Sequence, residues 1–95
     1  MPSKQTYEGE RNAAGQREGY GTMRNSNGDV YDGEWKANKA DGHGTIRFAD
    51  GEEYDGEWKA DKREGRGTCR YANGDEYVGE YRANSREGRG TFRYV

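Results

Sequence analysis

The sequence repeats itself at a step of 23 residues, and this periodicity limits the fold more than any other feature. The segments Gly21–Trp35, Gly44–Trp58 and Gly67–Tyr81 read GTMRNSNGDVYDGEW, GTIRFADGEEYDGEW and GTCRYANGDEYVGEY. The Tyr-x-Gly-Glu core of these segments also occurs once before them, and its four tyrosines, Tyr7, Tyr31, Tyr54 and Tyr77, are 24 residues apart once and 23 residues apart twice. A fixed step of roughly 20 to 50 residues is the signature of arrays in which each unit packs on its neighbours. The sequence therefore predicts a repeat array.

Each unit carries an Asn-Gly or Asp-Gly pair between two runs of strand-forming residues, which is a strong signal for a β-hairpin. A two-residue loop at Asp50-Gly51 would mix polar and apolar side chains on both faces of the hairpin. A three-residue loop, residues 49–51, with Gly51 in the left-handed region places Ile46 opposite Tyr54 instead. In this register one face is aromatic and aliphatic, and the other is polar and charged.

The expected fold is all-β: an elongated, curved single antiparallel sheet of consecutive β-hairpins with about eight strands and a repeat period of 23 residues. Residues 1–6 are expected to form an N-terminal tail, and residues 7–95 the array. The array divides into three full hairpins at 20–36, 43–59 and 66–82, with half units at 7–11 and 90–95.

Paired glycines on the aromatic face are the second constraint on the sheet. The same register places Gly44 opposite Gly56 and leaves a shallow trough, because neither residue has a side chain. We expect an aromatic ring from a nearby strand to lie over this backbone, with Trp35, Trp58 and Tyr81 as the candidates. The glycines also allow the sheet to curve.

These motifs resemble the MORN repeat. Tyr-x-Gly-Glu-Trp, Gly-x-Gly-Thr and Asn/Asp-Gly recur in phase from about Tyr7 to Tyr94. The resemblance implies an elongated, curved antiparallel sheet of hairpins and a scaffold or dimerisation role at cytoskeletal and membrane-junction sites. Phospholipid binding has also been proposed for such arrays. The chain departs from the family pattern at Arg11, Asn25 and Tyr81, so we expect the first unit to be the weakest.

The composition restricts the setting in which the chain works. Only 28% of the residues are apolar and 36% are charged, but the period and twelve aromatic residues favour a folded sheet over disorder. A single cysteine, Cys69, allows no internal disulfide and favours a reducing compartment. No stretch resembles a signal peptide or a membrane span. We therefore expect a cytoplasmic location, at the cytoskeleton or on the cytoplasmic face of a membrane.

Two surfaces are candidates for binding a protein partner. The aromatic face supplies the core, and where a single-layer sheet leaves it uncovered it would suit an extended peptide or an amphipathic helix. Its predicted anchors are Tyr31, Trp35, Tyr54, Trp58, Tyr77 and Tyr81. The open sheet edges are the second surface, since Phe92 and Tyr94 of one chain can meet Tyr7 of another and form a homo-oligomer.

Anionic phospholipid is the alternative partner. We expect the connections between hairpins, residues 11–19, 36–43, 59–66 and 82–89, to be long exposed loops along one edge of the sheet. They hold eleven basic and five acidic residues, a net charge of +6, while the rest of the chain carries −8. Solubility alone would account for such charges, but basic residues at this edge also suit lipid headgroups. The best-placed candidates are Lys62, Arg63, Arg66, Arg86 and Arg89.

We predict no enzymatic activity, catalytic residue, metal site or cofactor. His43 is the single histidine and stands inside a Gly-x-Gly marker, and Cys69 occupies a slot that is apolar in the other units. The recurring pairs Asp32/Glu34 and Asp55/Glu57 share one face, and their repetition indicates a solvated surface. Nucleic-acid binding is not expected, because the net charge is −2 and the aromatic and basic residues lie apart.

Overall fold

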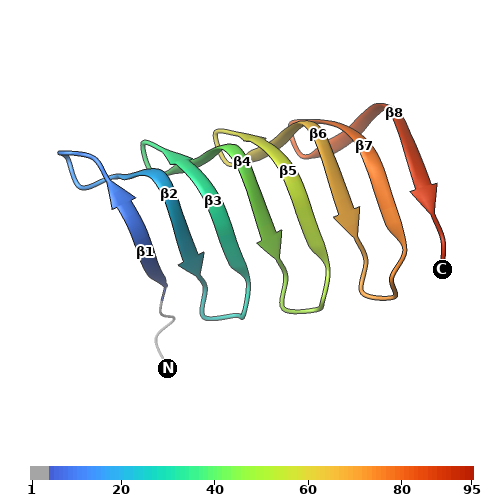
Figure 1. Ribbon diagram of the computed structural model, residues 1–95, viewed down its shortest axis with the longest axis horizontal. Coiled ribbons are helices and arrows are strands. Elements are labelled where there is room, and N and C mark those ends of the chain that lie inside the picture. The colour runs from blue at the N-terminus through green and yellow to red at the C-terminus, as the bar shows by residue number, and fades with distance from the viewer. Residues whose placement is uncertain (1–4) are drawn as a thin grey trace.

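The computed structural model describes residues 5–95 and consists of one open antiparallel sheet (Figure 1). Its strands are β1 (Thr6–Arg11), β2 (Arg17–Arg24), β3 (Val30–Lys36), β4 (Lys39–Arg47), β5 (Glu53–Lys59), β6 (Lys62–Arg70), β7 (Glu76–Arg82) and β8 (Ser85–Arg93). They lie side by side in sequence order, so the predicted all-β array of consecutive hairpins is confirmed. Of the predicted tail, residues 1–4 lie outside the described residues, and β1 already begins at Thr6.

The predicted register of the hairpins is also confirmed. Ile46 on β4 lies opposite Tyr54 on β5, and Gly44 lies opposite Gly56. The Phe48 N–H donates to the Glu52 carbonyl at 2.7 Å, and Gly51, with φ of 99°, donates its N–H to the Phe48 carbonyl at 3.0 Å. Residues 49–51 therefore form the expected three-residue loop with a left-handed glycine.

The connections at the opposite edge differ from the prediction. Long loops were expected at 36–43, 59–66 and 82–89, and this was wrong. In their place the structure has two-residue turns whose residues all have φ between 47° and 74°: Ala37-Asn38, Ala60-Asp61 and Ala83-Asn84. The other residues of these segments mostly extend β4, β6 and β8. Two consecutive positive φ angles match the right-handed twist of the flanking strands, which favours such tight turns.

The Asn or Asp of each tight turn binds the backbone of the preceding unit. The Asp61 N–H donates to the Ala40 carbonyl at 2.9 Å, and its carboxylate accepts the Ala40 N–H at 2.7 Å. Asn38 makes the same pair of bonds with Arg17, and Asn84 with Arg63. These turns therefore join each unit to the one before it.

Replacing Asp61 with Ala is expected to lower the free energy of unfolding by about 1–2 kcal/mol, because it removes a side-chain acceptor and places Ala at φ of 71°. Urea denaturation followed by circular dichroism measures the change. Asp61→Asn is the matched control and should leave stability nearly unchanged, since Asn occupies the same position in the other two turns. Equal losses in both variants would show that the side-chain bond to Ala40 does not stabilise the array.

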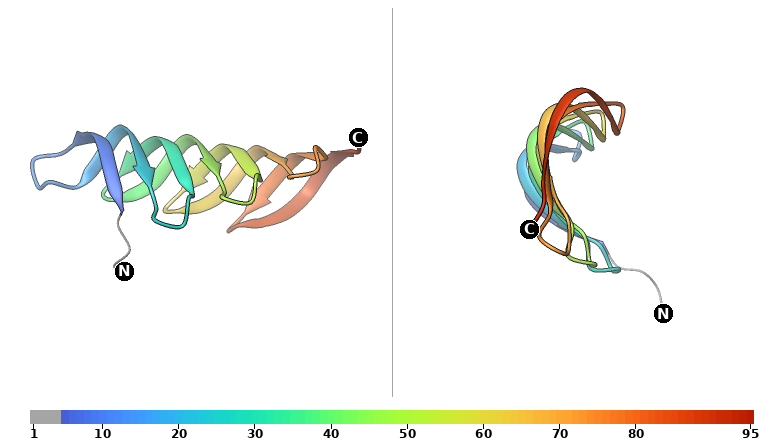
Figure 2. Two further views of the ribbon diagram at one scale, coloured as in Figure 1. Left: turned by 90° about the horizontal axis from the view of Figure 1, so that it is seen from below. Right: turned by 90° about the vertical axis from the view of Figure 1, so that its right-hand side faces the viewer.

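A row of glycines crosses the whole sheet and marks the place where it bends. Each glycine lies opposite the next one in the row, in the order Gly9, Gly21, Gly33, Gly44, Gly56, Gly67, Gly79 and Gly90. Directly beside this row the ladder between β3 and β4 shifts, so that residues 41–43 face Glu34 alone. Viewed along its length, the sheet has the outline of a hook (Figure 2). The predicted curvature is therefore present.

Tyrosines cover the glycine row. A Cβ atom on Gly44 would collide with the ring of Tyr31, and one on Gly67 would collide with Tyr54. We expected a ring such as Trp35 or Trp58 in this place, which was wrong. Tyr31 stands two residues before Gly33 on the same strand, so its ring reaches over the glycines of its own strand and of the next. The indole N–H of Trp35 instead donates to the Gly21 carbonyl at 3.0 Å, beside the row.

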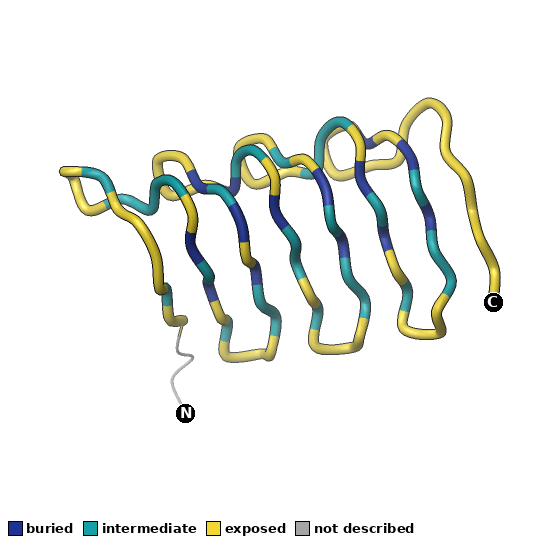
Figure 3. Tube along the Cα trace, in the orientation of Figure 1, coloured by how far each residue is buried: buried dark blue, intermediate teal, exposed yellow. Residues whose placement is uncertain are grey.

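The aromatic rings form one continuous row along the sheet and constitute its core. Neighbouring rings pack edge to face with centroids 4.9 to 5.8 Å apart, in the order Tyr7, Trp35, Tyr31, Trp58, Tyr54, Tyr81 and Tyr77. Edge-to-face packing at such distances adds about 0.5–1.5 kcal/mol per pair to the burial of the rings. Buried positions accordingly run through the middle of β2 to β7 (Figure 3). Below, the face that carries these rings is called the inner face and the opposite one the outer face.

Candidate interaction surfaces

The six predicted aromatic anchors lie together on the inner face, but they are largely inaccessible. Tyr54 has no exposed surface, and the exposed fractions of Tyr31, Trp35, Tyr77 and Tyr81 are only 5% or 6%. Trp58 is partly buried. The bend of the sheet encloses the rings, so a partner can reach few of their atoms.

Arginines stack on the inner face beside these rings. The guanidinium of Arg63 lies 5.2 Å from the ring centre of Tyr81, and its Nη2 donates to the Asn84 carbonyl at 3.0 Å. The guanidinium of Arg86 likewise stacks on Phe92, at 5.0 Å from its ring centre. Two predicted lipid-binding residues, Arg63 and Arg86, are therefore packed against aromatic rings, where a cation gains roughly 0.5–1 kcal/mol or more.

The other predicted lipid-binding residues lie elsewhere. Arg66 and Arg89 belong to the outer face, since each precedes a glycine of the inner-face row, and Lys62 is exposed at the start of β6. The five basic residues therefore do not form one surface: two lie on the inner face, two on the outer face, and Lys62 lies at the start of β6. Arg66 lies directly opposite Glu80 in the ladder between β6 and β7.

A shallow groove opens on the inner face near the C-terminal end of the array. It has a volume of about 460 Å³, and its lining includes Glu52, Arg63, Tyr71, Asn84 and Arg86. Burial raises the pKa of Tyr71, and the neighbouring Cys69 thiol raises it further. The lining combines acidic and basic side chains with amide and hydroxyl groups, all of which can form hydrogen bonds.

The recurring glutamates have a structural role that the sequence did not reveal. The carboxylate of Glu34 accepts the His43 N–H at 2.8 Å, and that of Glu57 accepts the Arg66 N–H at 3.1 Å. Glu10 binds the Tyr20 N–H in the same way. Each carboxylate thus closes the irregular part of the ladder beside the glycine row. The signal was the constant Glu after each Tyr-x-Gly, which we interpreted as a solvated residue.

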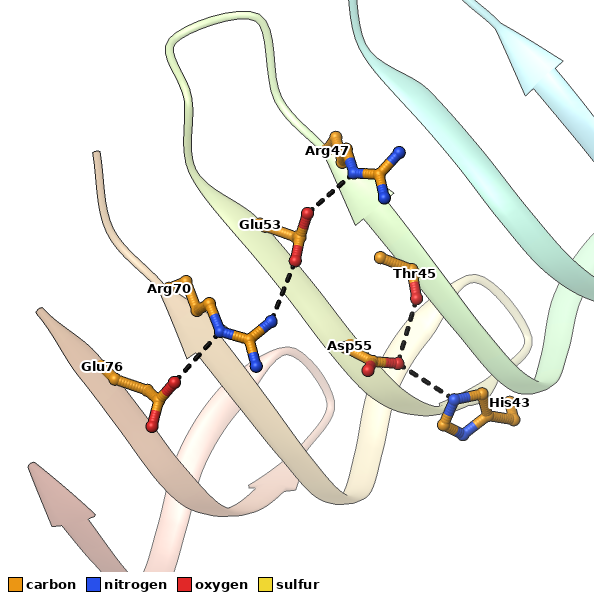
Figure 4. A network of polar contacts seen from close by, with 7 residues as sticks. All are labelled: His43, Thr45, Arg47, Glu53, Asp55, Arg70 and Glu76. Carbon is orange, nitrogen blue, oxygen red and sulfur yellow. Dashed lines mark hydrogen bonds and ion pairs between the residues drawn. The ribbon is translucent and has the colours of Figure 1, made fainter. Parts of the chain in front are cut away.

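A chain of ion pairs crosses the outer face (Figure 4). Glu53 accepts from Arg47 at 2.7 Å and from Arg70 at 3.0 Å, and Arg70 also binds Glu76 at 3.0 Å. The side-chain hydrogen bonds to Glu76 and Glu53 raise the pKa of Arg70. These ion pairs link neighbouring strands, and at this exposure each contributes at most about 1 kcal/mol. Bases and acids alternate, so this face offers no single-sign patch here.

His43 completes a smaller polar group on the outer face (Figure 4). Its Nε2 lies 2.9 Å from Asp55 Oδ1, and the Thr45 hydroxyl donates to the same oxygen at 3.0 Å. His43 and Asp55 line a hollow of about 310 Å³ on this face, and both side chains remain exposed to water. Within residues 5–95, no three His, Cys, Asp or Glu side chains are grouped so that they could hold a metal ion.

Burial of the tyrosines couples stability to alkaline pH. Burial, the largest cause, raises the pKa of Tyr54 to about 12 from a usual 10.0, and the nearby Arg63 guanidinium offsets part of this. Burial also raises the pKa of Tyr31 and of Tyr81. The unfolded chain therefore releases these protons at a lower pH than the folded chain. The resulting stabilisation is complete below about pH 10 and is lost as the pH rises toward 12.

We accordingly expect the urea midpoint to fall steadily between about pH 10 and about pH 12. Tyr54→Phe, which lacks the ionisable group, should make this fall less steep. A midpoint that stays constant over this range would contradict the burial of the tyrosine hydroxyls.

Exposed large apolar side chains gather at the end of the edge strand β8. Every residue of β8 is exposed, and the strand has a neighbour on one side only. The large apolar side chains with high exposure in residues 5–95 are Tyr20, Phe92, Tyr94 and Val95, with exposed fractions of 64%, 39%, 75% and 91%. Three of these four lie at the end of β8 or directly after it. Phe92 and Tyr94 also stack on each other at 5.6 Å.

The family follows from a comparison of the whole repeat pattern. The sequence profile of the MORN repeat matches the chain four times, at residues 13–30, 31–53, 54–76 and 77–95. The chain belongs to the MORN repeat family. The match covers β2 to β8, so the predicted resemblance is confirmed there, while β1 lies before it. No curated protein matches the chain.

MORN repeats are non-catalytic modules that generally take part in protein–protein or in membrane and lipid interactions. This MORN array has a buried aromatic core, an outer face of alternating charges and three exposed apolar side chains at the end of strand β8 or directly after it. Residues 5–95 include no helix with the length and apolar character needed to cross a membrane.

Proposed function

We propose that this MORN array is a non-enzymatic scaffold module and that a protein partner binds the edge of strand β8. The observation that carries the proposal is the exposed cluster of Phe92, Tyr94 and Val95 at this edge. A strand added to β8 would bond with its outward-facing backbone groups and cover the apolar side chains. Such a module would act at the cytoskeleton or on the cytoplasmic face of a membrane.

The edge is a better surface than the inner face. An anchor contributes most when it moves from water into an interface, and five of the six inner-face candidates are already almost fully buried. Phe92 and Tyr94 retain the exposed area that a partner can cover. The inner-face rings would then act indirectly, by holding β8 in position through the contact between Tyr77 and Phe92.

Binding of anionic phospholipids is the second candidate function. Arg89 on the outer face and Lys62 at the start of β6 are exposed and can touch lipid headgroups. Each would contribute on the order of 1 kcal/mol to the free energy of binding to an anionic surface. The stacking of Arg63 and Arg86 on aromatic rings leaves fewer basic residues for this role than the sequence suggested. We therefore favour binding of a protein partner over binding of lipid.

The test compares two variants that each remove an exposed aromatic residue. Phe92→Glu changes the β8 edge, and Tyr20→Glu is the matched control on β2, far from that edge. Immobilised chains capture partners from a cell extract, and quantitative mass spectrometry compares what is bound. The proposal expects proteins that are retained by the unmodified chain and by Tyr20→Glu and lost with Phe92→Glu. Equal retention by all three chains would contradict it.

Liposome co-sedimentation separates the second function from the first. Pelleting that requires an anionic lipid, weakens with salt and disappears in Lys62→Glu/Arg89→Glu would favour lipid binding. The favoured proposal expects no difference between neutral and phosphoinositide-containing vesicles.

A further inference from the structure

Building on the proposed edge function, we propose that one occupant of the β8 edge is strand β1 of a second copy of this chain, joined head to tail. The repeat register supports this pairing. β8 corresponds to β2, β4 and β6, and each of these pairs on its far side with the strand that follows it. β1 corresponds to those following strands, β3, β5 and β7, because Tyr7 aligns with Tyr31, Tyr54 and Tyr77.

This correspondence fixes the pairing residue by residue. Met23 pairs with Tyr31, Ile46 with Tyr54 and Cys69 with Tyr77, so Phe92 would pair with Tyr7 of the second copy. Gly90 would likewise meet Gly9 and continue the glycine row across the junction. Among the described residues, β1 and β8 each have a neighbouring strand on one side only.

The backbone of β8 is oriented for this pairing. In the equivalent strand β6, the Tyr71 N–H donates to the Asp75 carbonyl across the hairpin, so alternate residues of β6 direct their bonds toward β7. Phe92 and Gly90 occupy the equivalent positions of β8, so their backbone N–H and C=O groups point away from β7. The second copy would satisfy these groups.

The side chains at the junction are complementary in charge and size. Arg89 would lie opposite Glu10, repeating the pairing of Arg66 with Glu80. Thr91 would lie opposite Glu8, an arrangement close to that of Thr22, whose hydroxyl donates to Asp32 at 3.0 Å.

Arg11 would complete the aromatic row. It occupies the position held by Trp35, Trp58 and Tyr81, and each of those rings lies between the tyrosine of its own unit and that of the preceding unit. The guanidinium of Arg11 already lies 4.8 Å from the ring centre of Tyr7. At the junction its other side would face Tyr77 of the neighbouring copy. A cation stacked between two rings replaces an aromatic side chain there.

The assembly is open rather than closed. Joining β8 to β1 uses a different surface on each copy and leaves both edges free at the ends of the pair, so further copies can add. The mass of the unmodified chain, 10.8 kDa as a monomer, should therefore rise continuously with concentration in light scattering. A mass of one chain at every concentration, or a plateau at two chains, would overturn the proposal.

Disulfide trapping tests the register directly. The Thr91 and Glu8 positions would form a pair without direct backbone bonds, with Cα atoms about 4.5 Å apart, which a disulfide can bridge. We expect a mixture of Thr91→Cys and Glu8→Cys chains to form a covalent dimer under mild oxidation, and the double variant to form a ladder of multimers. The native Cys69 is buried, and the unmodified chain controls for its reactivity.

Two further controls test the register and the choice of partner strand. Pairing Thr91→Cys with Thr6→Cys shifts the thiols by two residues, to about 7–8 Å apart, and should lower the yield several-fold. Thr91→Cys alone should give little dimer. A strong dimer from this variant alone would overturn the proposal in favour of β8 pairing with β8. No cross-link in the mixture would also overturn it, whereas edge-dependent capture of another protein would leave the proposed function standing.

Discussion

Replacing Tyr54 with Ala is expected to lower the free energy of unfolding by about 3–5 kcal/mol and to leave the array largely unfolded. The Tyr54 ring is fully buried, packs edge to face on Trp58 and Tyr81, and covers the glycines of two strands. Its removal opens a cavity at the middle of the aromatic row, and each unit depends on its neighbours for stability. Urea denaturation followed by circular dichroism and fluorescence measures the loss.

Tyr54→Phe is the matched control for this prediction. It keeps the ring and removes only the hydroxyl that donates to the Glu57 carbonyl at 3.0 Å, at an expected cost of about 1 kcal/mol. If the Ala and Phe variants were equally stable, the ring would not be the central core residue.

Replacing Gly67 with Ala is expected to destabilise the array by about 1–3 kcal/mol, the second largest effect. In an ordinary strand this change would stabilise by roughly 0.5–1 kcal/mol, because Ala restricts the unfolded chain. Here the added Cβ would collide with the Tyr54 ring, and the neighbouring Gly56 backbone leaves the ring little room to move. The sign of the effect therefore reports the close approach of ring and backbone.

Thr68→Ala serves as the comparison, because Thr68 is the next residue and belongs to the outer face. Thr68→Ala should lower the free energy of unfolding clearly less than Gly67→Ala does in the same denaturation experiment. A Gly67→Ala variant more stable than the unmodified chain would mean that Tyr54 does not lie over the glycine row.

The sequence allowed the hairpins to be predicted because their register is overdetermined. Only one loop length at Asp50-Gly51 separates the two faces, and the same choice recurs in every unit. The turns at the opposite edge were not predicted, because Ala37 and its equivalents occupy the left-handed region, where Ala is uncommon. The Asn or Asp that follows each of them was the available signal.

The surfaces were harder to predict than the strands. Burial of Tyr54 and Tyr81 depends on how sharply the sheet bends beside its glycine row. The local sequence pattern does not predict the angle of this bend. Arg63 was expected in a solvated loop, but β6 continues through it and places it on the inner face. Once the strand is extended, the alternation of side chains gives the correct face.

Amide hydrogen exchange by NMR is the most direct test of the claim that the β8 edge is the working surface. We expect the outward-facing amides of Gly90 and Phe92 to exchange quickly in dilute solution and to become protected when a partner or a second copy binds. Protection that appears at the inner-face groove around Tyr71 and Arg86, with the β8 amides unchanged, would contradict it.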